Sequence, residues 1–481
     1  MPKEQHPPRV GAHMPGRGRN LLSKPGPECI AVLEEALAAL ARAFPIPGGH
    51  RRELPSSIRE LSRILTAERG ALSRSYWSAP RLASAYLYFF LPWNLYRLAW
   101  LLPGLDLSLH PGSRILDLGS GPLTLPLALW CARPELRGMP LSFECVDVAV
   151  KPMEHGRAVF RSLAGDGSPW RFTLRRSPVE KALLQAAKAV RAKEQAGFDC
   201  IMAGNVLNEL CESSAGDAPL ARRLDDLTGL AFDALAEAGR FFLLEPGTRL
   251  GGKLITLARR GALERGFLPL APCTHARACP MLDDMDGAPH TRKYSGWCHF
   301  IHPAEHASSE LQELSARAHL EKDSLALSCL VLERGAPVGS ASGPDRADSL
   351  DELEALYEEI MAEDGFGKHS LPVRDTVGQP APGAGAEASP APVRIISGPI
   401  RLPDRETPAR YACSEHGLAL LLDALHVPSG AAVQVPVPEK PRHDAKTGAL
   451  LLSRDAPRQR PTPGRAPRQR PDRSAGKKKR P

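Results

Sequence analysis

A glycine-rich turn follows a short aliphatic run that begins at Arg114, and its residue types are those of a ligand-binding loop. The run ends in Asp117 and Leu118, and Gly119 and Gly121 follow directly. Glycines permit a tight turn and a close approach of the backbone to a ligand, and a following helix offers free N–H groups. Thr124 stands where the dinucleotide motif G-x-G-x-x-G has its third glycine. The pattern therefore predicts a cofactor loop of another kind, or a tight turn without a ligand.

This D-x-G-x-G loop resembles the cofactor loop of class I S-adenosylmethionine methyltransferases. The resemblance implies that Gly119 and Gly121 face the methionine part of the cofactor and that Asp117 lies close to its amino-acid group. Asp147 ends the second predicted strand, where an acidic side chain can bind both ribose hydroxyls in doubly wound folds. The alternative for Asp147 is an ordinary cap at the end of a strand.

The fourth predicted strand is followed by two asparagines at the place where class I methyltransferases often face the transferred methyl group. These candidates are Asn205 and Asn208, and Asn205 is assigned to the cofactor site. The sequence lacks the Asn-Pro-Pro-Tyr signature of amino-group methylation, and Cys200 and Cys211 lack the context of a pyrimidine-attacking nucleophile. No catalytic residue is therefore assigned, because methyl transfer chiefly requires alignment of the acceptor with the sulfonium.

A second group of residues with potential chemistry lies in the later part of the chain. Cys273, Cys279 and Cys298 lie close together in sequence, and Cys413 could join them from a separate C-terminal segment. Such a density of thiols in a reducing compartment suggests a metal more than a disulfide. Four thiolates suit an iron–sulfur cluster or structural zinc, with unrelated cysteines as the remaining alternative. Further zinc ligands nearby in sequence would be His275, His299 and His302.

Several motifs around these cysteines resemble one family, the bacterial and mitochondrial ribosomal small-subunit methyltransferase-like proteins, whose mitochondrial members include methyltransferase-like protein 17. The motifs are Glu245-Pro-Gly-Thr, Ala271-Pro-Cys-Thr-His, Ala278-Cys-Pro, Trp297-Cys-His-Phe and Cys413-Ser. The resemblance covers roughly residues 72–439. It implies a [4Fe–4S] cluster on Cys273, Cys279, Cys298 and Cys413, and association with small-subunit ribosomal RNA during assembly.

Two functions are compatible with these features. The first is S-adenosylmethionine-dependent methylation of small-subunit ribosomal RNA, with Asp117, Gly119, Gly121, Asp147 and Asn205 holding the cofactor. The second is a catalytically silent assembly factor that binds RNA and carries structural zinc in place of the cluster. The expected partners are the small ribosomal subunit and its RNA, with no membrane and with the oligomeric state left open.

The elements that would position these residues alternate between short aliphatic runs and amphipathic segments, which is typical of a parallel sheet with helices on both faces. We predict strands over residues 114–118, 141–146, 171–175, 198–203, 239–245 and 325–333. Helices are predicted over residues 125–131, 152–163, 178–194, 220–237 and 253–260, and before the sheet over 28–44, 58–72 and 82–102 with a break near Pro92. The predicted fold class is α/β, a class I methyltransferase (Rossmann-like) sheet with a helical N-terminal region, a metal-binding cysteine insertion and a small β-rich C-terminal module.

Composition divides the 481 residues further, because 47 prolines and 41 glycines indicate long irregular stretches. Strand-like runs at 393–402 and 431–437 indicate the small module, and an acidic helix is predicted over 349–363. The expected divisions are a disordered N-terminus (1–27), a helical region (28–110), the cofactor domain with the cysteine cluster (111–335), a linker (336–391), the β module (392–440) and a disordered basic tail (441–481).

Charge and hydropathy bear on partners and location. The net charge is +8, and eleven Lys or Arg lie in residues 454–481, where a basic, Pro-rich tail can reach phosphates. The most apolar run, residues 83–102, is interrupted by Pro92, Asn94 and Arg97, which favours buried helices over a membrane span. We expect a bacterial cytoplasmic protein; a mitochondrial location is less favoured, because residues 1–27 are basic and Pro-rich rather than amphipathic.

Overall fold

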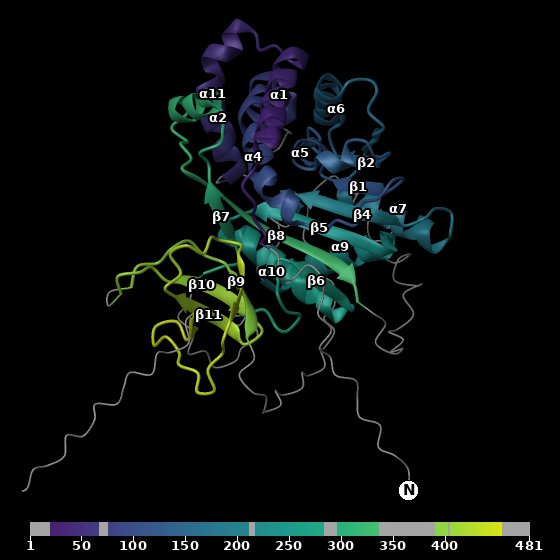
Figure 1. Cartoon of the computed structure of the whole chain (residues 1–481). Helices are drawn as coiled ribbons and strands as arrows, with labels where there is room; N and C mark the ends of the chain where they lie inside the picture. Colours follow the sequence, from purple (N-terminus) through teal and green to yellow (C-terminus); the bar gives the residue numbers. More distant parts are fainter. Residues whose placement is uncertain are drawn as a thin grey trace, which may run out of the picture.

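The computed structural model describes residues 20–66, 76–210, 217–282, 296–335, 390–402 and 405–454. Figure 1 shows a set of N-terminal helices, a central sheet with helices on both faces, and a separate β-rich module formed by the C-terminal part of the chain. The predicted helix at 349–363 and the basic tail after Arg454 lie outside the described residues.

The central sheet contains the five parallel strands that position the glycine loop. They are β1 (Arg114–Leu118), β2 (Ser142–Asp147), β3 (Arg171–Arg176), β4 (Phe198–Gly204) and β5 (Leu235–Pro246), in the order β3-β2-β1-β4-β5. The order reverses at β1, so the crevice outside the carboxyl ends of β1 and β4 is the place where such sheets bind ligands.

Three more strands extend the sheet beyond β5. The long strand β8 (Ser324–Arg334) runs antiparallel to β5, and both β6 (Phe267–Ala271) and β7 (Phe300–Pro303) pair with β8. The sequence did not predict β6 and β7, which are short. The class I methyltransferase fold expected from the sequence is confirmed by this mixed sheet with its helical N-terminus and separate β-rich module.

Alternate residues of the buried strands belong to two hydrophobic cores, one on each face of the sheet. In β1, Ile115 packs on one side and Leu116 on the other, as the twofold period of a strand requires. The first core includes residues of α5 (Thr124–Ala132) and α6 (Val150–Ala164). The second includes α7 (Val179–Arg191), α9 (Asp217–Ala234) and α10 (Arg249–Glu264). A short helix, α8 (Leu207–Leu210), follows β4.

The N-terminal helices add to the first core. They are α1 (Pro27–Ala43), α2 (Gly48–Thr66), α3 (Pro80–Ala85), a π-helical segment η3 (Tyr86–Phe90) and α4 (Leu91–Leu101). Two predictions here were inaccurate. Helix α2 begins ten residues before position 58 and tolerates Pro55, and the irregularity expected near Pro92 is the π-helical segment one turn earlier. Among the described helices, none has the length and apolar character needed to span a membrane.

The C-terminal module is a five-stranded sheet in the order β12-β9-β10-β11-β13. Its strands are β9 (Ala391–Ile395), β10 (Arg410–Ser414), β11 (Gly417–Leu422), β12 (Ala432–Val435) and β13 (Leu450–Ser453). The expected boundary at residue 440 was too early, because β13 pairs in parallel with β11 and buries Leu450 and Leu452 in the module's own core. The remaining helix, α11 (Ser309–Arg317), lies against α2 and starts at the side-chain cap Ser308.

Residues at the start of the described chain join the distant parts together. The amide of Leu21 donates to the carbonyl of Gly430 in the module at 2.9 Å, and the amide of Ser23 donates to Trp100 in α4 at 2.8 Å. The side chain of Asn20 accepts a hydrogen bond from the amide of Ala432 at 3.3 Å. The segment 20–23 therefore bridges the N-terminal helices and the C-terminal module.

Candidate functional site

The glycine loop leaves β1 in a conformation that few residues other than glycine adopt. Gly119 and Gly121 have φ values of +62° and +49°, in the left-handed region. A Cβ atom built on Gly119 would lie 2.5 Å from Cγ2 of Val206, so Gly119 is also required by the closeness of the β4–α8 connection. The loop is thus fixed both by its own backbone and by its neighbour in the sheet.

A cavity with an empty volume of about 330 Å³, including the part open to solvent, lies at the carboxyl ends of β1 and β4. Four of the five predicted cofactor residues line it: Asp117, Gly119, Gly121 and Asn205. The other lining residues are Tyr86, Leu98, Ser120, Thr124, Leu125, Gly204 and Leu244. Tyr86 and Leu98 come from the N-terminal helices and were missed, because no local pattern connects them with the glycine loop.

Two of the lining side chains carry buried acceptors that no described group satisfies. Both carboxylate oxygens of Asp117 and Oδ1 of Asn205 are buried without a hydrogen-bond partner among the described residues. Burial raises the pKa of Asp117 to about 8. Asn205 has a φ of +59°, which an asparagine tolerates better than most residues. Its backbone N–H donates a hydrogen bond to the backbone carbonyl of Leu244 at 2.7 Å. Such groups are costly unless a ligand pairs with them.

Asp147 lies beside the loop but is not among the residues that line the cavity. Its carboxylate accepts hydrogen bonds from the amides of Gly121 at 3.0 Å and Ala149 at 2.9 Å. Burial raises its pKa above the usual aspartate value, and these amides oppose the rise. The structure therefore gives Asp147 the role of holding the glycine loop.

The second asparagine after β4 is bonded to a glutamate rather than left free for a ligand. Asn208 donates from Nδ2 to Glu245 at 2.8 Å, and the amide of Leu207 donates to the same carboxyl group at 2.9 Å. Glu245 is fully buried, and burial raises its pKa to about 8. The hydrogen bonds of Glu245 thus link the end of β5 to the segment after β4. They give the glutamate of the Glu-Pro-Gly-Thr motif a structural role.

Replacing Asp117 with asparagine is expected to make folding less sensitive to pH. The folded-state pKa lies above the unfolded value, so the unfolded chain binds fewer protons between about pH 4 and pH 8 and stability falls as the pH rises through this interval. Between pH 4 and pH 8 the parent should lose about 2 kcal/mol or more of stability that the variant does not lose, because one pKa unit corresponds to about 1.4 kcal/mol. Urea midpoints measured from pH 4 to pH 8 test this, and parallel pH profiles for both proteins would contradict it.

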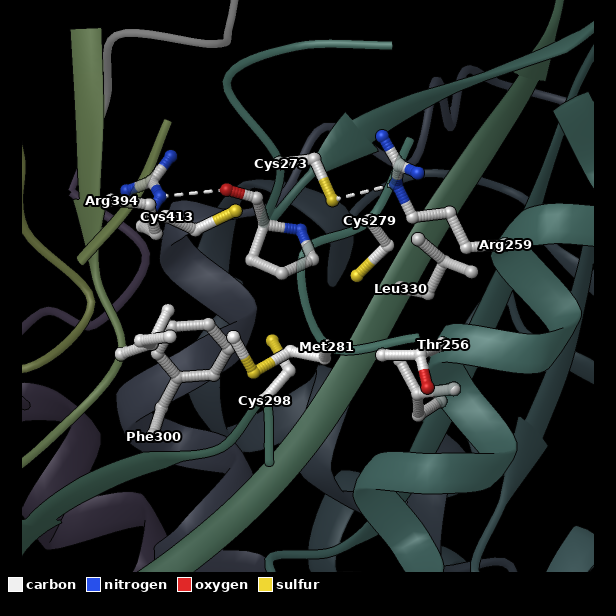
Figure 2. Close-up of a pocket in the computed structure, with 13 residues that line it drawn as sticks. Thr256, Arg259, Cys273, Cys279, Met281, Cys298, Phe300, Leu330, Arg394 and Cys413 are labelled. Atoms are coloured by element: carbon white, nitrogen blue, oxygen red, sulfur yellow. Dashed lines mark hydrogen bonds between the residues drawn. The ribbon is translucent and has the colours of Figure 1, made fainter. Parts of the chain in front are cut away.

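The four predicted metal-binding cysteines line a second cavity, which has an empty volume of about 420 Å³, including the part open to solvent. Figure 2 shows Cys273, Cys279, Cys298 and Cys413 around this space, with Met281 and Phe300 on the apolar side. Three of the cysteines come from the segments between α10 and β7, and Cys413 comes from β10 of the module. The structure thus brings together residues that are up to 140 positions apart in sequence.

Two buried arginines flank the thiols, and sequence analysis did not identify either of them. Arg259 of α10 donates from Nε to the sulfur of Cys273 at 3.2 Å, and Arg394 of β9 donates from Nε to the carbonyl of Pro272 at 2.7 Å (Figure 2). Each arginine is only 2% exposed. Burial lowers the pKa of Arg394 to about 10 and raises that of the Cys413 thiol well above its ordinary value. The cavity therefore combines four thiols with two positive charges.

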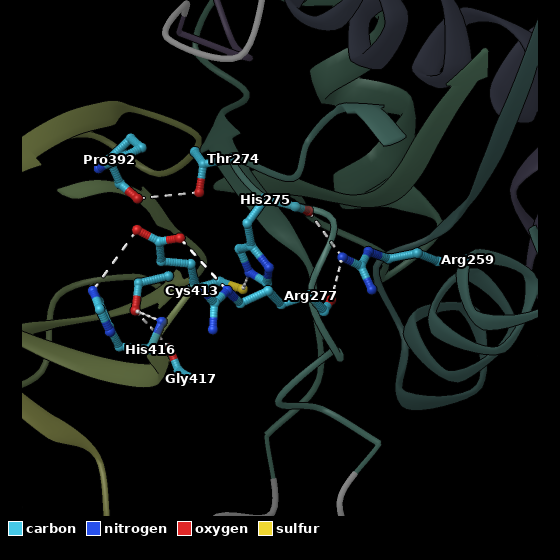
Figure 3. Close-up of polar contacts among 10 residues, drawn as sticks. Arg259, Thr274, His275, Arg277, Pro392, Cys413, His416 and Gly417 are labelled. Carbon is cyan, nitrogen blue, oxygen red and sulfur yellow. Dashed lines mark hydrogen bonds and ion pairs between the residues drawn. The ribbon is translucent and has the colours of Figure 1, made fainter. Parts of the chain in front are cut away.

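Polar contacts tie the module to the cofactor domain beside this cavity. His275 Nε2 lies 3.3 Å from the Cys413 sulfur, and Thr274 donates from Oγ1 to the carbonyl of Pro392 at 3.1 Å; Figure 3 shows both contacts as dashed lines. An exposed ion pair joins Arg277 to Glu415 at 3.7 Å. The cysteine cavity is consequently part of the interface between the two units.

The other histidines proposed as zinc ligands point elsewhere. His299 stacks on Trp297 with ring centroids 4.9 Å apart, and His302 stacks on Trp100 at 4.8 Å; neither lines the cavity. Within the described ranges, no group of three or more His, Cys, Asp or Glu side chains is close enough together to hold a metal ion. The thiols therefore stand around the cavity rather than around one point.

Comparison with curated proteins gave no match. Solved structures similar to part of the chain include a methyltransferase from Pyrococcus furiosus, with 17% identity, a TM-score of 0.23 and coverage of 34% of this chain and 68% of that one. An SAM-dependent methyltransferase from Agrobacterium tumefaciens shows 10% identity and a TM-score of 0.23, and the match covers 36% of this chain and 49% of that one. TrmN from Thermus thermophilus shows 19% identity and a TM-score of 0.24, and the match covers 57% of this chain and 53% of that one. The chain spans about half the length of the latter two proteins.

Residues 111–339 match the model of a family described as mitochondrial small ribosomal subunit Rsm22. This description corrects the expected bacterial cytoplasmic location, because it points to mitochondria. The correction was not accessible from the composition of residues 1–27, on which the expectation depended. Over residues 111–339 the resemblance to a ribosomal small-subunit methyltransferase-like family is therefore confirmed.

Proposed function

We propose that the chain is an S-adenosylmethionine-dependent methyltransferase that acts on the RNA of the small ribosomal subunit in mitochondria. The observation that carries the proposal is the cavity at the carboxyl ends of β1 and β4, where Asp117 and Asn205 hold buried acceptors without partners. A cofactor with an amino group and hydroxyl donors would satisfy such acceptors. The association with the small subunit is supported by the family match.

Each residue of the pocket has a definite part in this proposal. Bound S-adenosylmethionine supplies a methyl group on a positively charged sulfonium. Asp117 would bind the amino group, and Gly119 and Gly121 let the backbone approach the methionine part without a side chain in between. Asp147 keeps the loop in place through the amide of Gly121. Tyr86 and Leu98 cover the pocket from the N-terminal helices and exclude water.

A non-catalytic assembly factor is the second candidate, and the surroundings of Asn208 favour it. Asn208 was expected to face the transferred methyl group, yet its amide is bonded to the buried Glu245. In this alternative the same pocket binds the cofactor, and the ligand stabilises a shape that binds RNA.

Transfer of labelled methyl groups to small-subunit RNA distinguishes the two candidates. We expect the full chain to label RNA from small subunits of a strain in which its gene is deleted, and Asn205→Ala to reduce the labelling. The methylation map of that strain should lack at least one modification. An unchanged map together with normal cofactor binding would overturn catalysis and favour the assembly factor.

We further propose that the cysteine cavity holds a [4Fe–4S] cluster. The four thiols and the flanking Arg259 and Arg394 suit a negatively charged thiolate cluster. A single zinc ion requires its thiolates about 2.3 Å from one point. The four thiols line one cavity together with two arginines, and this set of donors and charges is the basis of the cluster proposal.

RNA binding is part of the same proposal. Residues 454–481 carry eleven Lys or Arg, and such a segment gains affinity for RNA by releasing counterions. The contribution of the tail is independent of the RNA sequence, so recognition of the acceptor would depend on the folded part of the chain.

A further inference from the structure

Two basic residues, Arg97 and Lys322, belong to segments at the carboxyl edge of the sheet, the edge at which the cofactor pocket lies. Arg97 directly precedes Leu98, which lines the pocket. Lys322 precedes β8, and because Leu327 of this antiparallel strand is paired with Pro246 at the end of β5, residues before 327 extend beyond that edge. Open α/β sheets bind their ligands at this edge. Residues 97 and 322 thus both belong to segments at the edge from which an acceptor would approach.

Arg97 is a partly buried cation with little to compensate its charge. The only side-chain hydrogen bond of Arg97 within the described part of the chain is from Nη1 to Oδ1 of Asn94 at 3.0 Å, and its Nε is buried without a partner. Burial lowers its pKa to about 10, yet it remains charged at neutral pH. No carboxylate of the described residues forms an ion pair with it.

Lys322 is in a similar environment. Its Nζ lies 5.9 Å from the ring centroids of both Phe89 and Trp93, and burial followed by repulsion from Arg97 lowers its pKa. The described residues provide no carboxylate partner for Lys322 either. Two like charges are therefore held near each other in a partly desolvated, aromatic setting, which is unfavourable without an anion.

The nearby histidines do not add to this charge. His302 is 2% exposed, burial lowers its pKa to about 4, and it is consequently neutral at pH 7. His306 also stacks on Trp100, with ring centroids 5.9 Å apart, and its Nε2 lies 3.3 Å from a carboxylate oxygen of Glu305. The positive charge available to a ligand belongs to Arg97 and Lys322.

We propose that Arg97 and Lys322 bind a backbone phosphate of the RNA strand whose nucleotide enters the cofactor pocket. The identification of RNA as the occupant depends on the function proposed above, whereas the anion site depends only on the two cations. A guanidinium can bind two phosphate oxygens at once, and an ammonium adds a point charge. The rings of Phe89 and Trp93 beside Lys322 are buried in the core, so the ammonium group rather than an aromatic face is what this segment offers to a ligand.

Arg97→Met and Lys322→Met in the full-length chain test this site, with Arg161→Met as the control. The side chain of Arg161, on α6, is 71% exposed and does not line the pocket. The probe is a short single-stranded RNA of mixed sequence, and its affinity is measured by fluorescence anisotropy over a range of salt concentrations. Each test variant should bind about tenfold more weakly, since hydrogen bonds to charged groups contribute at that level. The slope of the logarithm of the RNA affinity against the logarithm of the salt concentration should become shallower by about one. Arg161→Met should change neither the affinity nor this slope.

Two further measurements separate the possible explanations. Arg97→Met should melt at the same temperature as the parent or higher, because methionine removes a poorly compensated buried charge. Unchanged RNA affinity in both variants would overturn the proposal, as would a loss of S-adenosylmethionine affinity in Arg97→Met, which would assign the arginine to the cofactor's carboxylate. If the parent bound no S-adenosylmethionine but the variants still lost RNA affinity, the phosphate site would stand and the methyltransferase function would fail.

Discussion

Replacing Gly119 with alanine is expected to abolish measurable binding of S-adenosylmethionine. The new Cβ would lie 2.5 Å from Cγ2 and 2.8 Å from Cβ of Val206, closer than carbon atoms approach without displacement. The left-handed backbone at φ +62° adds about 1–2 kcal/mol of strain. Relief requires movement of either the loop or the β4–α8 connection, and both Gly119 and Asn205 line the pocket. Isothermal titration calorimetry should show a loss of about 100-fold or more, equivalent to about 2.7 kcal/mol.

The matched control for this variant is Gly165→Ala. Gly165 follows α6 with φ +73°, and nothing lies within 4 Å of a Cβ built there. This variant therefore acquires backbone strain at a positive φ without a collision and at a residue that does not line the cofactor pocket, so it should lose stability and retain cofactor affinity. Binding by Gly119→Ala at the parent's affinity would show that the loop does not contact the cofactor.

Cys413 is one of the four ligands of the proposed cluster, and Cys413→Ala is expected to abolish iron binding. Protein purified without oxygen should be brown, with absorbance near roughly 400 nm from iron bound to thiolates, and the variant should lose this absorbance along with its iron and sulfide. Cys329→Ala is the control, because Cys329 is fully buried in β8 and does not line the cavity. It should keep its iron at a modest cost in stability. Colourless parent protein with one zinc ion per chain would contradict the cluster.

Loss of iron should also loosen the C-terminal module. Cys413 would be the module's ligand, while the remaining links across the boundary include the Thr274–Pro392 and Arg394–Pro272 hydrogen bonds. Without iron, Arg259 and Arg394 would lie buried beside uncharged thiols, which is unfavourable. Limited proteolysis should therefore cut Cys413→Ala between the two units faster than Cys329→Ala. Equal cleavage rates would show that the protein contacts suffice to hold the module.

The parallel part of the fold was predictable because its signals are local. Strands β1 to β4 begin and end within one residue of the predicted ranges, since each is a short aliphatic run between turn residues. The glycine loop and the cysteines were recognisable for the same reason: their residue types and spacing are restricted by chemistry. The structure also brought Asp117, Gly119, Gly121 and Asn205 to one cavity.

The features that were missed depend on contacts between distant segments. Tyr86 reaches the cofactor pocket from a π-helical segment, and Arg259 reaches Cys273 from the interior of a helix that reads as ordinary and amphipathic. Strand β13 is four residues long and is stabilised by its pairing with β11, more than 25 positions earlier. Asp147 was predicted to bind a ribose, which stays a prediction, and no local pattern indicated that its carboxylate also accepts hydrogen bonds from two backbone amides.

The bridge between Leu21 and Gly430 has a consequence for the order of events during synthesis. A ribosome makes the N-terminus first, yet the amide of Leu21 finds its partner only after more than 400 further residues have been joined. Contacts of such sequence separation form late, because the intervening chain must first be ordered. Cys273 is likewise able to approach Cys413 only after 140 further residues have been synthesised. The nascent chain would therefore emerge with its α/β sheet able to fold but its four thiols still apart, and iron insertion would be a step that follows translation.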